Sequence, residues 1–171
     1  MDHVESGYYF TCDDDLIYPE SFTAIIISAL EVRAGHAVAG FHGWDAKPEQ
    51  KSYHRDRAKN YHCLFDQEGP RLCHIIGTGC TGWKVGALRI DISDFPRKNM
   101  ADLWFSRLCN AQQIPRIVLP HKADYLKYTV PRAGTTIWDE NSRDLSKEQF
   151  QTDLLNATKW RRGEIFGRAV A

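Results

Sequence analysis

Gly7-Tyr8-Tyr9-Phe10-Thr11-Cys12-Asp13-Asp14-Asp15 is a short aromatic and β-branched run that stops at three aspartates. Such a run is typical of a buried strand that ends in a loop. We therefore expect the aspartates at the carboxyl end of a strand. Pro19 suits the first turn of a following helix, and Gly35 suits its end. The apolar residues of that helix recur at helical spacing: Phe22, Ile25, Ile26, Ala29 and Leu30.

Farther along, strands and helices continue to alternate. Further strands are predicted at residues 37–42, 72–76 and 116–119, the second of them closing on a tight turn at Gly77-Thr78-Gly79. Asn99 is a predicted N-cap for a helix that Pro115 ends, and Ser146 with Gln149 predicts a capping box for a last helix to about Trp160. The pattern predicts an α/β fold in one domain, residues 1–171, without separating a parallel from a mixed sheet.

Residues 43–60 are polar and dense in charge, so we expect a flexible loop that acts as a functional flap. Its basic side chains could draw in an anionic acceptor or fold over donor phosphates. The simpler interpretation is a solvated flap. The residues concerned are Lys51, Arg55, Arg57 and Lys59.

The overall charge gives no sign of a nucleic-acid partner, because 22 basic and 22 acidic side chains cancel to a formal net charge of zero. Five scattered cysteines and a start without a signal region favour the cytoplasm. The longest apolar stretch, residues 24–30, is too short to cross a bilayer, so peripheral membrane association is the remaining membrane alternative.

Three adjacent carboxylates are costly to hold together, because each raises the pKa of the others unless a cation is present. Mg²⁺ or Mn²⁺ would relieve this repulsion and leave coordination positions for phosphate oxygens. The alternative is an acidic turn that only favours the start of the next helix. The aspartates alone leave both readings open.

Three segments together carry a resemblance to a known family. Residues 8–19, with Asp13-Asp14-Asp15, look like the strand and D-x-D motif of type-A glycosyltransferases, especially the large family-two group. The segment Ile76-Gly77-Thr78-Gly79-Cys80-Thr81-Gly82-Trp83 resembles the acceptor segment of that group. The segment Asn99-Met100-Ala101-Asp102-Leu103-Trp104-Phe105 resembles its helix with the catalytic acid residue.

The resemblance implies a mixed sheet flanked by helices, like the C-terminal part of the type-A fold, and a hexosyltransferase-like enzyme of polysaccharide or glycan biosynthesis. A sugar would pass, with inversion, from a nucleoside diphosphate sugar to a carbohydrate hydroxyl. Asp15 and Asp13 would bind Mn²⁺ or Mg²⁺, and Asp102 would be the general base. The expected donor-binding residues are Asp13, Asp14, Gly77, Thr78, Gly79 and Trp83.

Other side chains have two readings each. His121 would be a late metal ligand or phosphate contact, against a solvated loop histidine. Trp83 and Trp44 would stack on a sugar, against a place in the core or at its rim. A zinc site is the less favoured reading of a scattered set that contains no C-x-x-C pair: His62, Cys63, Cys73, His74 and Cys80.

The sequence departs from the family at its start, where six residues precede Gly7 and the N-terminal nucleotide-binding units are expected to be missing. The chain alone would then be inactive, completed by another polypeptide, or self-associated through a sheet edge. One alternative function is a catalytically silent interaction or carbohydrate-binding module. Another is a metal-dependent phosphohydrolase.

Overall fold

The computed structural model describes residues 5–129 and 144–161 of the chain. Its central element is a five-stranded mixed sheet. The strands are ordered β1 (Tyr8–Cys12), β8 (Cys80–Lys84), β3 (Val38–Gly40), β9 (Arg116–Val118) and β6 (Arg71–Leu72). β8 is antiparallel to both neighbours, whereas β3 and β9 are parallel. The carboxyl ends of β1, β3 and β9 therefore meet at one edge, where β8 begins. The α/β class with a mixed sheet is confirmed.

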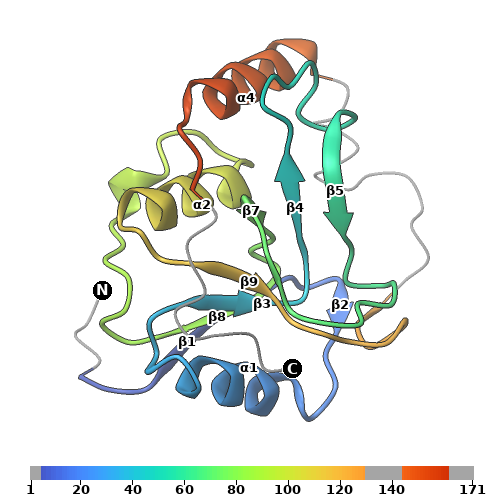
Figure 1. Ribbon diagram of the computed structural model, residues 1–171, viewed down its shortest axis with the longest axis vertical. Helices are drawn as coiled ribbons and strands as arrows, with labels where there is room; N and C mark the ends of the chain where they lie inside the picture. The colour runs from blue at the N-terminus through green and yellow to red at the C-terminus, as the bar shows by residue number, and fades with distance from the viewer. Residues whose placement is uncertain (1–4, 130–143, 162–171) are drawn as a thin grey trace.

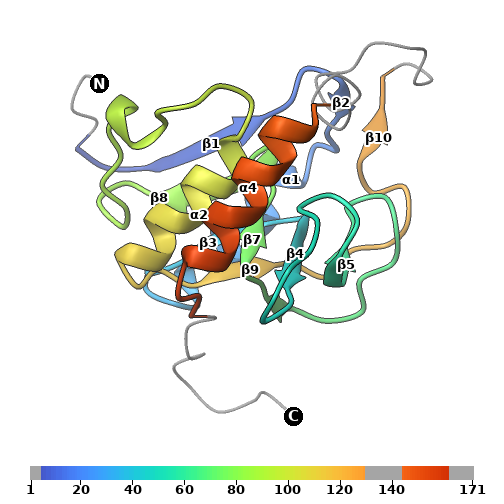
Figure 2. The same cartoon turned by 90° about the horizontal axis from the view of Figure 1, so that it is seen from above.

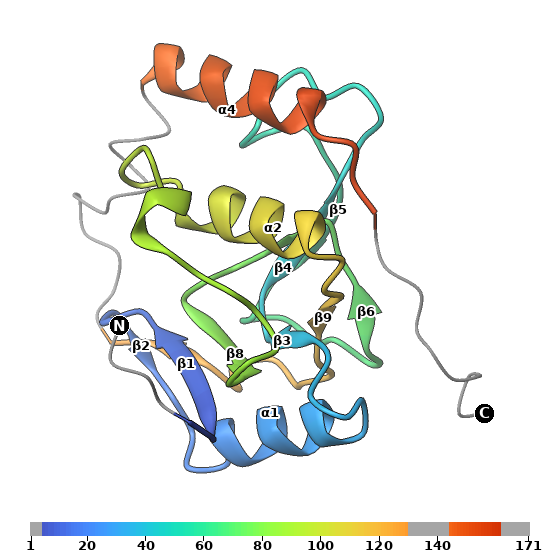
Figure 3. The same ribbon diagram turned by 90° about the vertical axis from the view of Figure 1, so that its left-hand side faces the viewer.

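Helices cover both faces of this sheet, as Figure 3 shows. α1 (Phe22–Glu31) lies on one face and α2 (Ala101–Ala111) on the other, with α4 (Leu145–Ala157) beyond α2 (Figures 1 and 2). None of the described helices combines the length and the apolar character needed to cross a membrane. Other short elements are η1 (Ile92–Asp94) and the pair β2 (Leu16–Ile17) with β10 (Lys127–Tyr128).

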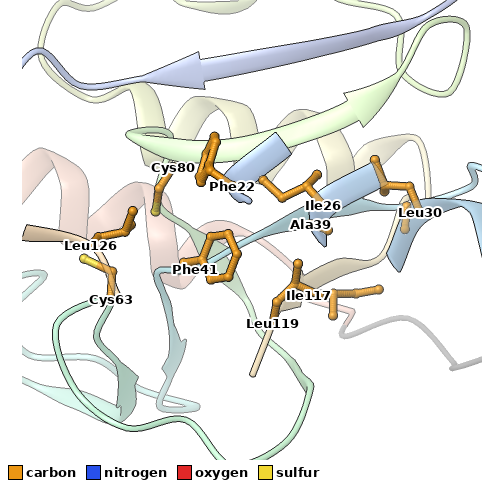
Figure 4. Packing of buried hydrophobic residues seen from close by; sticks show 11 residues of the cluster. Phe22, Ile26, Leu30, Ala39, Phe41, Cys63, Cys80, Ile117, Leu119 and Leu126 are labelled. Carbon is orange, nitrogen blue, oxygen red and sulfur yellow. The ribbon is translucent and has the colours of Figure 1, made fainter. Parts of the chain in front are cut away.

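α1 follows the predicted spacing, because Phe22, Ile26 and Leu30 are buried on one face. They pack against Phe41 and Ile117 from the sheet in the cluster of Figure 4. Burial of each such side chain contributes about 1.5–3 kcal/mol. Two details differ from expectation: Ile25 is partly exposed, and the helix begins after Pro19, whose carbonyl accepts a hydrogen bond from the amide of Phe22.

Gly35 ends the first helical segment as predicted. Its φ of 76° lies in the left-handed region that favours glycine, and its amide donates to the carbonyl of Leu30 at 2.9 Å. This hydrogen bond satisfies one of the last helical carbonyls and turns the chain toward β3.

Residues 43–60 differ from the expected loop. They contain β4 (Gly43–Ala46) and the start of β5 (Arg57–Tyr61), which form a second sheet with β7 (Ile75–Ile76) in the order β5-β4-β7. Trp44 is buried and packs on Tyr53 with ring centroids 5.3 Å apart. All four residues of β4 are buried, so the strand lacks the alternating pattern by which a half-exposed strand is recognised.

Two helix caps also differ from expectation. Asn99 has a φ of 56° and precedes Met100, which occupies the N-cap position of α2 without a capping side chain. Asp144 caps α4 instead of Ser146, because its carboxylate accepts hydrogen bonds from the amides of Ser146 and Lys147. The strand predicted at 72–76 is split between β6 and β7.

Candidate functional site

The aspartate loop is attached to the turn that precedes β8. The amide of Asp13 donates a hydrogen bond to the carbonyl of Gly79 at 3.1 Å. The hydroxyl of Tyr18 accepts from the amide of Asp13 at 2.7 Å and donates to the carbonyl of Gly79. Because β1 and β8 are paired up to Cys12 and Cys80, the two loops leave the sheet side by side.

Gly79 leaves room for the carboxylate of Asp13. A Cβ atom at this position would lie 2.0 Å from Oδ2 of Asp13, which is closer than any real contact. The carboxylate of Asp13 therefore lies directly against the backbone of the Gly77–Gly79 turn. This close approach gives a physical reason for a glycine in the turn.

Asp102 meets the same turn from the other side of the sheet. It lies in the first turn of α2, and its Oδ1 accepts hydrogen bonds from both the amide of Thr78 at 2.8 Å and the hydroxyl of Thr78 at 2.7 Å. The residue is half-buried. Thr78 thus fixes the Asp102 carboxylate, while no hydrogen bond to its Oδ2 occurs among the described residues.

The Asp13 carboxyl is partly desolvated and lies near other carboxylates. Burial, followed by the charges of Asp102, Asp15 and Asp14, raises its pKa to about 6. The residue as a whole is nevertheless exposed, although its carboxylate lies against the turn. A bound cation would offset this repulsion.

The other predicted donor-site residues differ in exposure and in their hydrogen bonds. Asp14 is exposed, and Asp15 is half-buried with its carbonyl accepting from the amide of Thr129 at 2.9 Å. The amide of Gly77 donates to the carbonyl of His42. The carboxylates of Asp13 and Asp15 are oxygen ligands of the kind that Mg²⁺ and Mn²⁺ prefer.

Trp83 does not belong to the site. It is 7% exposed and lies in the core between Tyr9 and Phe105, with ring centroids 5.7 and 5.2 Å away. The sugar-stacking role is therefore corrected to a packing role. Trp44 is also a packing residue, because it lies in a core cluster with residues of α2.

His121 has contacts that explain its position without a metal. Its Nδ1 lies 2.8 Å from the carbonyl of Leu119, and its Nε2 lies 3.4 Å from the carbonyl of His62. The ring is buried at the edge of Phe41. These contacts favour a structural residue, and they give the metal-ligand role no support.

The residues considered for zinc are divided by the fold. Cys73 and His74 lie apart from the others, with the Cys73 thiol on the carbonyl of Arg116 and His74 beside Asp45. His62 and Cys63 lie together after β5, where they meet a third side chain that the sequence reasoning missed, His42. His42 could have been found from the sequence, because it lies two residues after β3 and therefore at the same sheet edge as Asp13.

No protein-family model matches this chain, and no curated protein matches it. The functional argument therefore depends on the site itself. The site joins an aspartate loop, a glycine turn and a carboxylate on α2 at one edge of a mixed sheet.

Proposed function

We propose that this chain carries the catalytic site of a metal-dependent glycosyltransferase, which transfers a sugar from a nucleoside diphosphate sugar to an acceptor hydroxyl. The observation that carries the proposal is the meeting of Asp13 and Asp102 at the Gly77–Gly79 turn. These residues lie far apart in sequence and belong to the three segments that resemble the family.

The donor would lie at the aspartate loop. Asp15 and Asp13 would hold Mn²⁺ or Mg²⁺, which would neutralise the charge that develops on the departing diphosphate. Burial and the neighbouring carboxylates together raise the pKa of Asp13, which supports this assignment, because a divalent cation offsets the cost of keeping these carboxylates ionised. Asp14 is exposed, and we assign it only a contact with the nucleotide-sugar donor.

Asp102 would act as the general base. The acceptor hydroxyl loses its proton to Asp102 as its oxygen attacks the anomeric carbon, and the bond from that carbon to the diphosphate oxygen breaks. Thr78 orients the carboxylate through two hydrogen bonds to Oδ1, so Oδ2 is the oxygen that we expect to accept the proton. Preorganisation of this kind lowers the cost of reaching the reactive geometry.

A second candidate is a catalytically silent interaction module. The observation in its favour is the position of β1, which among the described strands pairs with β8 alone and forms one edge of the five-stranded sheet. Edge strands pair readily with another chain. This candidate predicts association without metal-dependent nucleotide binding, so one titration separates the two functions.

The test is a calorimetric titration of uridine diphosphate into the purified chain, with and without Mn²⁺. We expect binding that requires Mn²⁺ and that Asp15→Asn abolishes. Guanosine and cytidine diphosphates follow in the same assay, because the diphosphate contacts proposed here do not select a base. The transfer step is then tested with the corresponding nucleotide sugars.

Asp153→Asn is the matched control, since it removes the same charge from an exposed position on α4. It should bind as the parent chain does. Absence of Mn²⁺-dependent binding of all three diphosphates to a chain with a cooperative unfolding transition would contradict the proposal. Equal loss in both variants would show that only overall charge matters.

A further inference from the structure

A compact group of nitrogen and sulfur ligands lies at the sheet edge that also carries Asp13. One ligand atom from each of His42, His62 and Cys63 lies within 4.8 Å of the other two. His42 joins β3 to β4, and the other two residues directly follow β5. Two segments about twenty residues apart are thereby brought to one point.

We propose that His42, His62 and Cys63 bind a zinc ion, at a site separate from the Mn²⁺ or Mg²⁺ site of the aspartates. Imidazole nitrogen and thiolate sulfur are the ligands that Zn²⁺ prefers, whereas Mg²⁺ and Mn²⁺ prefer oxygen. A tetrahedral zinc ion sets its ligand atoms roughly 3.5 Å apart, given the bond lengths of about 2.0–2.3 Å. Side-chain movements of about 1 Å would therefore bring the three ligand atoms to that spacing.

Two histidines and a cysteine also occur in blue-copper sites, which add a weak axial methionine. Within the described part of the chain, methionine occurs only at position 100, and Met100 packs with Trp44 and Leu103 in another core cluster. The described residues therefore do not supply the axial methionine of a blue-copper site, and we assign the group to zinc.

The side-chain contacts of the group are compatible with metal binding. The Cys63 side chain is in hydrogen-bond contact with the side chains of Cys80, His42 and His62. A thiolate is the form of cysteine that binds a metal. The backbone amides of Cys63 and Leu64 face Nδ1 of His42 and His62 at 3.4 and 3.2 Å, long contacts with which a metal can compete.

Access and position support the assignment. Both histidines are half-buried, which leaves a route from solvent, and Cys63 is buried. The ring of His42 also lies against the Gly77–Gly79 turn, because a Cβ on Gly77 would be 2.8 Å from its Cδ2. A zinc ion would therefore fasten the chain after β5 to the turn that contacts Asp13.

The experiment is a titration of the metal-free chain with Co²⁺, a spectroscopic substitute for Zn²⁺, followed by displacement with Zn²⁺. We expect visible bands of the intensity typical of tetrahedral cobalt and a near-ultraviolet band from thiolate-to-cobalt charge transfer. Cys63→Ser should abolish the charge-transfer band. A chelator competition then measures zinc affinity, and Zn²⁺ should raise the melting temperature.

His62→Gln provides a second variant, which replaces a half-buried side chain in case Cys63→Ser fails to fold. We expect it to lose at least the roughly 10- to 100-fold in affinity that loss of a supporting residue costs at metal sites. Cys73→Ser is the matched control, because that thiol lies outside the group; it should bind zinc as the parent chain does.

Asp15→Asn separates this inference from the proposed function. It should leave zinc binding unchanged while it removes Mn²⁺-dependent nucleotide binding. Zinc affinity that depends on Asp15 and not on His62 would overturn the assignment. So would a cobalt complex without a sulfur charge-transfer band in the folded parent chain.

Discussion

Replacement of Asp13 by asparagine should stabilise the metal-free protein at neutral pH. The pKa of the Asp13 carboxyl is raised from 3.8 to about 6, so the folded state binds this proton more tightly than the unfolded chain does. The free energy of unfolding therefore falls as pH rises from 3.8 to about 6, and it stays lower above that range. Asparagine carries no charge and should remove this loss.

The magnitude follows from the same pKa difference. At about 1.36 kcal/mol for each pH unit, the difference corresponds to about 3 kcal/mol. Asp13 is exposed, however, and solvent screens its neighbours, so we expect a gain of about 1 kcal/mol. For a domain of this size, that gain raises the melting temperature by about 2–4 °C.

Urea unfolding of the metal-free chain and of Asp13→Asn, at neutral pH and in acidic buffer below the Asp13 pKa, measures the effect. The gain should shrink in acid, where the carboxyl is already protonated. Asp14→Asn removes the same charge one position along, from an exposed side chain, and should give a smaller gain. A variant no more stable than the parent at neutral pH, or a gain independent of pH, would refute the raised pKa of the Asp13 carboxyl.

Bound Mn²⁺ should reverse the difference in stability between the parent chain and Asp13→Asn. Mn²⁺ at a hundred times its dissociation constant should stabilise the parent chain by about 2.7 kcal/mol and Asp13→Asn by much less. Thermal unfolding with and without Mn²⁺ checks this expectation. The same side chain would then destabilise the metal-free fold and stabilise the loaded one, as expected of a binding residue.

Three further predictions test other parts of the structure. Asp102→Asn should lower sugar transfer by about 10²- to 10⁴-fold, with Mn²⁺-dependent nucleotide binding unchanged in calorimetry. Gly79→Ala should displace the Asp13 carboxylate and weaken Mn²⁺ binding in the same titration, whereas Gly69→Ala, which has open space around it, should not. Trp44→Ala should lower the free energy of unfolding by about 3–5 kcal/mol in urea; a flexible loop would give almost no change.

Local patterns predicted the elements that bring the chemistry to the sheet edge. The apolar spacing of α1 and α2 and the aromatic run of β1 are visible because each repeats over several residues. Sequence patterns did not reveal the residues whose side chains are covered on both faces. β4 was hidden because all of its residues are buried, and Trp83 gave no sign that both of its faces are covered by other rings.

The amino-acid sequence by itself determined the α/β class, the acidic loop after β1 and the glycine turn before β8, because short-range periodicity and turn chemistry are properties of neighbouring residues. Tertiary structure alone decided which side chains meet. Thr78 and Asp102 are 24 residues apart and bond because α2 packs against β7, which leads into the turn that holds Thr78. His42 joins His62 and Cys63 only because β3 and β5 end near the same point.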